Sequence, residues 1–273
     1  MLCLISLNKN KYSINFIFKT MKKLMFFVLL VFSATKLWSQ DPFAYPSQEQ
    51  KPVEDRNFRI PLIGETAPSF TAESTSGEIT FPDNYGRNWK VLFSHPQDFT
   101  PVCTTELLEL ANLQDQFDKL GVKIVAVSTD RLDTHEQWKK AMEGLVYKDR
   151  KSVKIDFPIV ADENLAVSKK YGMIHAATNT TRDVRGVYII DPDNIIQAIY
   201  FYPKNVGRNT DELLRMITAL QKSSDEHVMT PANWKAGDDV LIPTIPNANA
   251  SAEELASEGF YNLAWFVWYK KAK

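Results

Sequence analysis

Residues 90–107 read KVLFSHPQDFTPVCTTEL, an order that predicts a β-strand passing through a short loop into a helix. The apolar run at its start is typical of a buried strand, and Pro96 lies in the loop that follows it. We expect Thr100 to be the N-cap of the helix, because a proline follows it at the first helical position. Cys103 then falls in the first helical turn, where unpaired backbone N–H groups and the helix dipole favour a thiolate.

The chain around this stretch alternates between strand and helix patterns. Apolar runs predict strands, and apolar residues at helical spacing predict helices. The expected strands are 79–81, 90–94, 122–129, 157–160, 186–191 and 195–202. The expected helices run over 101–121, around Trp138 and over 164–171, and a last helix is expected to be capped by Asn209 or Thr210. Residues 192–194 (PDN) are typical of a hairpin turn. This order predicts an α/β fold with a central mixed sheet flanked by helices.

Beyond about residue 222 the pattern changes, because prolines and pairs of acidic residues interrupt it. The chain then approaches its end with LAWFVWY, residues 263–269. We expect so aromatic a segment to pack on the main domain or on a second subunit rather than to remain in water. The sequence therefore predicts one domain over 58–222 and a small C-terminal extension over 223–273.

The first 39 residues are predicted to be a signal peptide. Residues 21–23 (MKK) are basic, and residues 24–34 form an apolar run that is shorter than a membrane-spanning helix requires. We expect translation to start at Met21, cleavage to leave Gln40 first, and a flexible lead-in over 40–57. The protein would then be exported to the periplasm of a Gram-negative bacterium, without stable membrane insertion. The alternatives are an uncleaved anchor and, if the leader is not used, a cytoplasmic protein.

The charge pattern argues against a nucleic-acid partner. The 273-residue chain has a net charge of −1, but residues 1–39 contain six lysines and no acidic residue. Residues 40–273 therefore carry 26 basic and 33 acidic side chains, a balance of −7, without a basic stripe. His135, His175 and His227 lie far apart without metal-ligand spacing, and no nucleotide loop or haem motif is present. We expect no metal and no bound cofactor.

The residues around Cys103 resemble the peroxiredoxins. Pro96, Thr100 and Cys103 match the family hallmark Pro-x-x-x-Thr-x-x-Cys. His95 before the proline, together with a single cysteine in the predicted mature chain, is similar to the 1-Cys subgroup. Further similar segments are 185–188 (RGVY), 202–203 (YP), 207–209 (GRN) and 230–234 (TPANW). The resemblance covers roughly residues 58–245 and implies a thioredoxin-like fold, in agreement with the order of strands and helices.

The resemblance implies a thiol-dependent peroxidase that reduces hydrogen peroxide and organic hydroperoxides. The thiolate of Cys103 would attack the terminal peroxide oxygen, release water or an alcohol and become a sulfenic acid. By the same resemblance, Arg185 stabilises the thiolate and the polarised peroxide, Thr100 hydrogen-bonds the peroxide, and Pro96 shields the sulfur.

Three further residues complete the site that the resemblance implies. Glu106, one helical turn after Cys103, is expected to orient an arginine, and Arg208 is expected to complete that pair. The alternative for both residues is an ordinary surface ion pair. His95 either lies near the sulfur, where it could hold a proton or assist the following step, or is a structural histidine.

The cysteine count bears on how the sulfenic acid is reduced. Cys3 lies in the predicted leader, so no intramolecular disulfide can form and an external thiol or other small reductant must act. The resemblance implies at least a homodimer. Two other functions stay open: a holdase or scaffold that uses the fold without peroxidase turnover, and a thiol–disulfide oxidoreductase. The second is disfavoured because Thr100 stands where the first cysteine of Cys-x-x-Cys would be.

Overall fold

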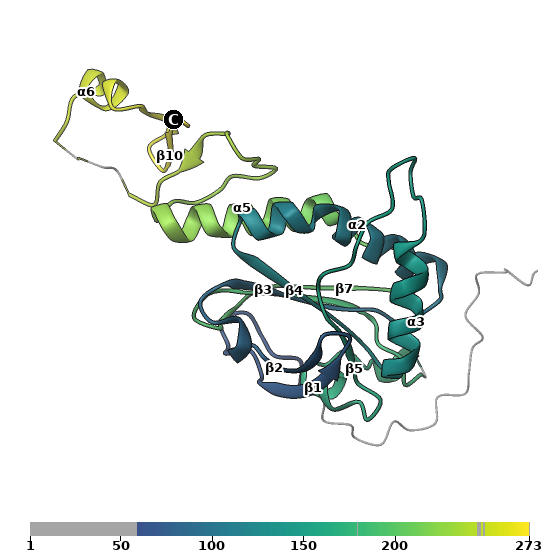
Figure 1. Cartoon of the computed structure of the whole chain (residues 1–273). Helices are drawn as coiled ribbons and strands as arrows, with labels where there is room; N and C mark the ends of the chain where they lie inside the picture. The colour runs from purple at the N-terminus through teal and green to yellow at the C-terminus, as the bar shows by residue number, and fades with distance from the viewer. Residues whose placement is uncertain (1–58, 179, 245–246, 248, 273) are drawn as a thin grey trace, which may run out of the picture. The chain divides into compact units, whose positions relative to one another are not determined.

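The computed structural model of the chain describes residues 59–178, 180–244, 247 and 249–272 (Figure 1). The predicted signal peptide over 1–39, with its start at Met21 and with Cys3, and the lead-in over 40–57 lie outside the described residues. Among the helices that are described, none combines the length and the apolar composition needed to cross a bilayer.

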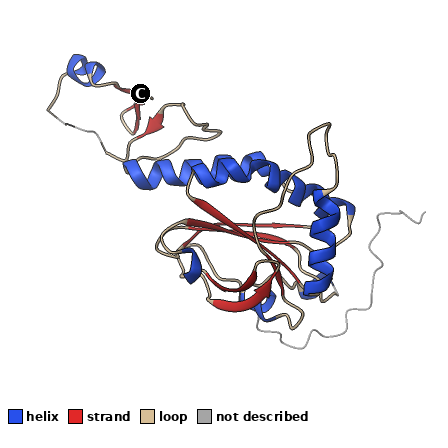
Figure 2. Cartoon of the chain, in the orientation of Figure 1, coloured by secondary structure: helices blue, strands red, loops and turns tan. Residues whose placement is uncertain are grey.

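A seven-stranded sheet forms the centre of the fold (Figure 2). Its strands are β1 (Phe70–Ser74), β2 (Gly77–Phe81), β3 (Trp89–Ser94), β4 (Val122–Ser128), β5 (Ile159–Ala161), β6 (Arg185–Ile190) and β7 (Ile196–Tyr202). They lie in the order β2-β1-β5-β4-β3-β6-β7, with β3, β4 and β5 parallel and the other pairs antiparallel. The predicted mixed sheet is confirmed, and β6 lies directly beside β3.

Helices and a hairpin cover the two faces of this sheet. The helices on this sheet are α2 (Pro101–Lys119), α3 (Leu132–Glu143), α4 (Ala166–Lys170) and α5 (Thr210–Glu226), whereas α6 (Ala252–Ser257) belongs to the C-terminal extension. Successive residues of β3 point to opposite faces, so Val91 and Phe93 belong to one core and Leu92 to the other. The first core includes side chains of α2, α3 and α5, and the second includes those of α4, β1 and β2. In Figure 1, α2 and α5 lie on one side of the sheet and the β1–β2 hairpin on the other.

Helices α2 and α5 begin after the predicted N-cap positions, but only one of the two N-cap side chains makes a capping hydrogen bond. Asn209 accepts a hydrogen bond from the backbone N–H of Glu212 at 3.0 Å. Thr100 has the extended backbone of an N-cap, with φ −107° and ψ 146°, yet its side chain makes no capping bond. Its hydroxyl donates instead to the carbonyl oxygen of Gln97 at 2.8 Å. The first turn of α2 is therefore left without the usual side-chain cap.

The C-terminal extension contains a small sheet, with β10 (Val267–Lys270) between β8 (Val240–Leu241) and β9 (Phe260–Ala264). Val228, Trp234 and Val240 pack together with Ala219 of α5. This apolar cluster joins the extension to the last helix of the main domain.

The aromatic tail is packed only in part. Tyr261 of β9 stacks on Tyr269 of β10, with ring centroids 5.1 Å apart. Leu263, Trp265 and Phe266, at and beside the turn between these strands, are 71, 83 and 69% exposed. These three side chains do not pack on the main domain, because the turn points them into solvent. Packing on a second subunit stays a prediction.

Candidate active site

Cys103 lies in the first turn of α2, just beyond the carboxyl end of β3. Its thiol is free and fully buried, and no other cysteine occurs in the part of the chain that the structure describes. The connecting loop, residues 95–100, turns sharply at Phe99, whose φ is 54°. Open α/β sheets bind ligands at the carboxyl ends of their strands, so the thiol occupies a typical site position.

Arg185, the first residue of β6, contacts the sulfur from the neighbouring strand. Its Nη1 lies 3.2 Å from Cys103 Sγ. Its Nε donates to the carbonyl oxygen of Lys204 at 3.0 Å, and Nη2 donates to the same oxygen, so the guanidinium is fixed in orientation. A cation at hydrogen-bond distance favours the thiolate form of a cysteine.

Ser94, the last residue of β3, fixes the backbone on both sides of Arg185. Its hydroxyl donates to the carbonyl oxygen of Val184 at 2.7 Å and accepts from the N–H of Gly186 at 2.8 Å. A Cβ at Gly186 would lie 3.0 Å from this hydroxyl oxygen, so a glycine lets the two strands approach here. Sequence reasoning missed Ser94, because a serine at a strand end carries no distinctive signal.

Glu106 joins the two predicted arginines through one buried carboxylate. Its Oε2 accepts from Arg185 Nη1 at 2.6 Å and from Arg208 Nη2 at 2.7 Å. Its Oε1 accepts from Nε and from the backbone N–H of Arg208, both at 2.8 Å. Burial alone would raise the pKa of the Glu106 carboxyl, but the hydrogen bonds and charges of Arg208 and Arg185 outweigh it and hold the pKa below its usual range.

Arg208 is buried as deeply as its partner, so the alternative of a surface ion pair is wrong. Its Nη1 donates to the carbonyl oxygens of Ser94 at 2.8 Å and Gly186 at 2.9 Å, and its guanidinium carbon lies 3.3 Å from the ring centroid of Phe93. Burial lowers the pKa of Arg208 below its usual range, although Glu106 acts in the opposite direction. The pair therefore ties α2 to β3 and β6.

Pro96 and Thr100 both lie on the loop that leads to the sulfur. Pro96 is buried, and Thr100 is partly exposed. The Thr100 hydroxyl, which donates to Gln97, keeps its oxygen lone pairs as acceptors. Cys103 is the third residue of the helix, so its N–H is one that a capping side chain would have engaged. The first turn thus keeps backbone donors beside the thiol.

His95 is fully buried and pairs with Asp98. Its Nε2 lies 2.8 Å from Asp98 Oδ1, and its ring centroid lies 5.0 Å from that of Trp138. Burial lowers the pKa of His95 below its usual value in spite of the Asp98 carboxylate, so the ring is neutral at pH 7. This geometry favours the structural alternative for His95 over a direct role at the sulfur.

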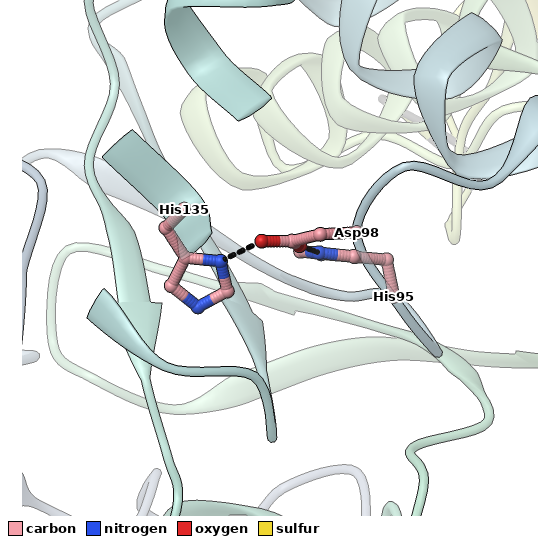
Figure 3. A group of neighbouring side chains, drawn as sticks. All are labelled: His95, Asp98 and His135. Carbon is pink, nitrogen blue, oxygen red and sulfur yellow. Dashed lines mark hydrogen bonds and ion pairs between the residues drawn. The ribbon is translucent and has the colours of Figure 1, made fainter. Parts of the chain in front are cut away.

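Asp98 and His135 were missed by sequence reasoning. His135, expected to stand apart from other histidines, lies with its Nδ1 2.6 Å from Asp98 Oδ2 (Figure 3). The possible metal-ligating atoms of His95, Asp98 and His135 all lie within 4.8 Å of one another. Both oxygens of Asp98 already accept hydrogen bonds, so hydrogen bonds hold this cluster together. The separation of 37 positions between Asp98 and His135 hides the contact in the sequence.

Comparison with known proteins gives two family models and several relatives. The AhpC/TSA family matches residues 63–199, and the C-terminal domain of 1-Cys peroxiredoxin matches residues 219–257. A peroxiredoxin of Methanosarcina mazei is 45% identical over 215 residues, covering 78% of this chain and 98% of the relative. The mitochondrial peroxiredoxin of Saccharomyces cerevisiae is 42% identical over 198 residues, covering 70% of this chain and 74% of the relative.

Solved structures give the same result. Yeast mitochondrial 1-Cys peroxiredoxin matches with a TM-score of 0.66 and 36% identity, over 78% of this chain and all of that one. A cysteine-to-serine variant of peroxiredoxin 6 of Arenicola marina matches with a TM-score of 0.68 and 35% identity, over 78% of this chain and 99% of that one. With its buried thiol held by Arg185, the chain belongs to the peroxiredoxins, the family of thiol-dependent peroxidases, and to their 1-Cys subgroup.

Proposed function

We propose that this peroxidase reduces hydrogen peroxide and organic hydroperoxides with Cys103 as the nucleophile. The observation that carries the proposal is the 3.2 Å contact between Arg185 Nη1 and Cys103 Sγ. Cleavage of an O–O bond needs a nucleophile, a fixed positive charge and hydrogen-bond donors for the departing oxygen. The thiol, the guanidinium and the first turn of α2 supply these three groups.

The first step oxidises the sulfur and reduces the peroxide. The Cys103 thiolate donates an electron pair to the terminal peroxide oxygen, so that an S–O bond forms and the O–O bond breaks. The departing oxygen takes up a proton and leaves as water or an alcohol, and the sulfur becomes a sulfenic acid. Arg185 stabilises the negative charge as it moves from sulfur to oxygen, Thr100 accepts a hydrogen bond from the peroxide, and Pro96 shields the thiol.

An external thiol is the proposed reductant. Cys103 is the only cysteine in the described ranges, and Cys3 lies in the predicted leader, so no partner for an intramolecular disulfide is expected. One thiol would displace water from the sulfenic acid to give a mixed disulfide, and a second thiol would release Cys103 as its own disulfide forms. The yeast mitochondrial 1-Cys relative is resolved through glutathione and thioredoxin systems, which supports a donor of this class. No prosthetic cofactor is required for either step.

Export to the periplasm is proposed from the N-terminal sequence. The basic residues 21–23 and the apolar run 24–34 support a signal peptide that ends at Ser39. N-terminal sequencing of the native protein should find Gln40 or its cyclised form. A mature chain that begins at Met1 or Met21 would contradict export with cleavage.

Steady-state peroxide consumption tests the proposed function. The mature protein is given hydrogen peroxide or an alkyl hydroperoxide, with dithiothreitol, glutathione or reduced thioredoxin as the donor. We expect turnover with at least one donor, and none after Cys103→Ser, which exchanges only the sulfur for oxygen. A wild-type protein that consumes neither peroxide would contradict the proposal. Suppression of aggregation that survives in Cys103→Ser, without wild-type turnover, would favour the holdase, which no feature of the site supports.

A further inference from the structure

His95, Asp98 and His135 form a buried cluster beside the loop that precedes Cys103. They are 0, 3 and 0% exposed, and the two histidines approach opposite oxygens of the one carboxylate (Figure 3). His95 Nε2 lies 2.8 Å from Oδ1, and His135 Nδ1 lies 2.6 Å from Oδ2. His95 and Asp98 belong to the loop, whereas His135 belongs to α3. Asp98 therefore links the loop to a helix that carries none of the residues proposed for the reaction.

Both ring nitrogens of His135 face oxygen acceptors. Nδ1 faces Asp98, and Nε2 lies 3.2 Å from the carbonyl oxygen of Val160 in β5. A carboxylate oxygen accepts, so the contact with Asp98 is made by an N–H on His135 Nδ1. Burial alone would raise the pKa of Asp98, but the hydrogen bonds from His135 and His95 outweigh it and hold the pKa below its usual value. Asp98 is thus a carboxylate that contacts a ring nitrogen of each histidine.

His95 contacts the other oxygen of the same carboxylate. Its Nε2 faces Asp98 Oδ1 and must carry the proton, whereas its Nδ1 is buried without a hydrogen-bond partner. The ring is neutral, so Nδ1 is a bare acceptor. One carboxylate therefore orients both rings and fixes the tautomer of His95.

The backbone of Asp98 is anchored as firmly as its side chain. Its N–H donates to Asp130 Oδ2 at 2.7 Å, and Asp130 is paired with Arg182. Side chain and backbone together hold the loop 95–100, which carries Pro96 and Thr100, at its middle.

Helix α3 makes a second set of contacts with the loop 95–100 and the start of α2, through Trp138. Trp138, three residues after His135, packs with its ring centroid 5.0 Å from that of His95. Its Nε1 donates to the hydroxyl of Thr104, the residue after Cys103, at 3.2 Å. The helix that supplies His135 therefore contacts the loop and the first turn of α2 together.

We propose that His135 is a positioning residue for the peroxide step. It acts through Asp98, which holds the loop 95–100 in the geometry that brings peroxide to Cys103 and keeps His95 as the Nε2–H tautomer. The proposal rests on the proposed function. The charged groups around the cluster are Asp130 and Arg182 beside the loop, and Arg208 on the side of His95.

A bound metal ion is the competing interpretation of this cluster. Metal coordination by the same atoms would need bare lone pairs on His95 Nε2 and His135 Nδ1. Both nitrogens instead lie at hydrogen-bond distance from Asp98. The geometry therefore favours a hydrogen-bonded cluster over a metal site.

Two variants of His135 and one matched control test the proposal. His135→Phe removes the polar contacts of both ring nitrogens, whereas His135→Asn keeps an amide donor that can reach Asp98. His227→Asn is the control, because His227 is exposed at the end of α5 and has a left-handed backbone that asparagine tolerates. Stopped-flow kinetics give the rate constant for oxidation of Cys103 by hydrogen peroxide, and iodoacetamide alkylation gives the reactivity of the thiolate alone.

We expect His135→Phe to slow oxidation by about tenfold or more, the range in which small misplacements act. His135→Asn should recover part of this loss, and His227→Asn should match the wild type. The alkylation rate should change far less than the oxidation rate, since it does not need a positioned peroxide. In ¹⁵N NMR spectra of the wild type, His95 should carry one ring proton, on Nε2.

Equal oxidation rates in the wild type and a folded His135→Phe would overturn the positioning role while leaving the proposed function intact. A wild type that does not react with peroxide would defeat the proposed function itself, and this inference with it. If His135→Phe does not fold, His135→Asn and the NMR spectra decide, and a His95 without a proton on Nε2 overturns the proposal. Stoichiometric metal in the purified protein, lost in His135→Asn, would also overturn it.

Discussion

Arg185 Nη1 lies 3.2 Å from Cys103 Sγ, although 82 positions of the chain separate the two residues. The contact arises because β6 pairs antiparallel with β3, which brings the first residue of β6 beside the loop that leaves β3. Glu106 then fixes the same guanidinium from one turn further along α2. The sheet, rather than local sequence, assembles the charge around the thiol.

Loss of the Arg185 charge should slow the reaction with peroxide. For Arg185→Met we expect the oxidation rate of Cys103 to fall by about 10²-fold or more, the usual cost of removing a preorganised charge from a reacting centre. The oxidation rate of Arg185→Lys should lie between those of the wild type and Arg185→Met. Lysine keeps the positive charge but lacks the planar guanidinium that hydrogen-bonds Lys204 and Glu106. Stopped-flow kinetics measure the rate, and the ultraviolet absorbance of the thiolate reports its ionisation. Rates equal to the wild type in both variants would contradict the role of Arg185.

Glu106→Gln should destabilise the fold, because it leaves Arg185 and Arg208 buried without a counter-charge. We expect a loss of about 3 kcal/mol in the free energy of unfolding, as for other broken buried ion pairs. Glu253→Gln is the matched control, since Glu253 is exposed on α6. Denaturant unfolding at pH 7 measures both, and equal stability of the two variants would show that the carboxylate is not needed.

The same carboxylate predicts a pH dependence. The folded pKa of Glu106 lies below the ordinary value of 4.5, so its contribution is complete above that pH and is lost as the pH falls from 4.5 through the folded pKa. Wild-type stability should therefore drop in this acid range more steeply than that of Glu106→Gln. Parallel stability curves for the two proteins would contradict the lowered pKa.

Asp183→Asn should stabilise the protein at neutral and alkaline pH. Both carboxylate oxygens of Asp183 are buried without a hydrogen-bond partner, since the hydroxyl of Ser168 donates to Asp162. Burial, assisted by the charges of Asp162 and Asp130, raises the pKa of Asp183 well above 3.8, so the folded state keeps a proton that the unfolded state loses.

Wild-type stability should consequently fall as the pH rises above 3.8, by up to about 1.4 kcal/mol per pH unit. Asp183→Asn lacks this term. Its advantage over the wild type, measured by denaturant unfolding at several pH values, should therefore grow from pH 5 to pH 8. An advantage that is constant or shrinks over this range would show that Asp183 is ionised in the folded protein.

We expect the exposed turn of the aromatic tail to contribute to self-association. Leu263, Trp265 and Phe266 together form an apolar surface that a homodimer could cover. Trp265→Ser should leave the stability of the folded chain nearly unchanged, because the side chain is 83% exposed, but weaken association. Sedimentation velocity over a range of concentrations measures the effect. Identical dimers in both proteins, or a wild-type monomer, would contradict a role for this turn.

Local patterns predicted the part of the fold around the thiol. The strand that ends at Ser94, the N-cap position of Thr100 and the capping by Asn209 all depend on residues within a few positions of one another. Such features follow from backbone preferences, so the sequence is sufficient for them. The family motif added Arg185 and Arg208, which no local pattern would have joined to Cys103.

The features that were missed depend on contacts between distant segments. β1 has only two buried positions at its ends, Phe70 and Ser74, and becomes a strand by pairing with β2 and β5. His135 reaches Asp98 only after α3 packs over the loop. The Thr100 side chain does not cap α2, because its hydroxyl hydrogen-bonds the carbonyl oxygen of Gln97 instead. The local sequence does not determine which of these two rotamers is adopted.

A single turnover of the reduced protein with one equivalent of hydrogen peroxide, followed by intact and peptide mass spectrometry, shows whether peroxide oxidises Cys103. We expect rapid loss of the free thiol, one added oxygen atom on the peptide that contains Cys103, and no disulfide within the chain. A Cys103 that stays reduced, while oxygen is taken up by methionine or not at all, would contradict this expectation.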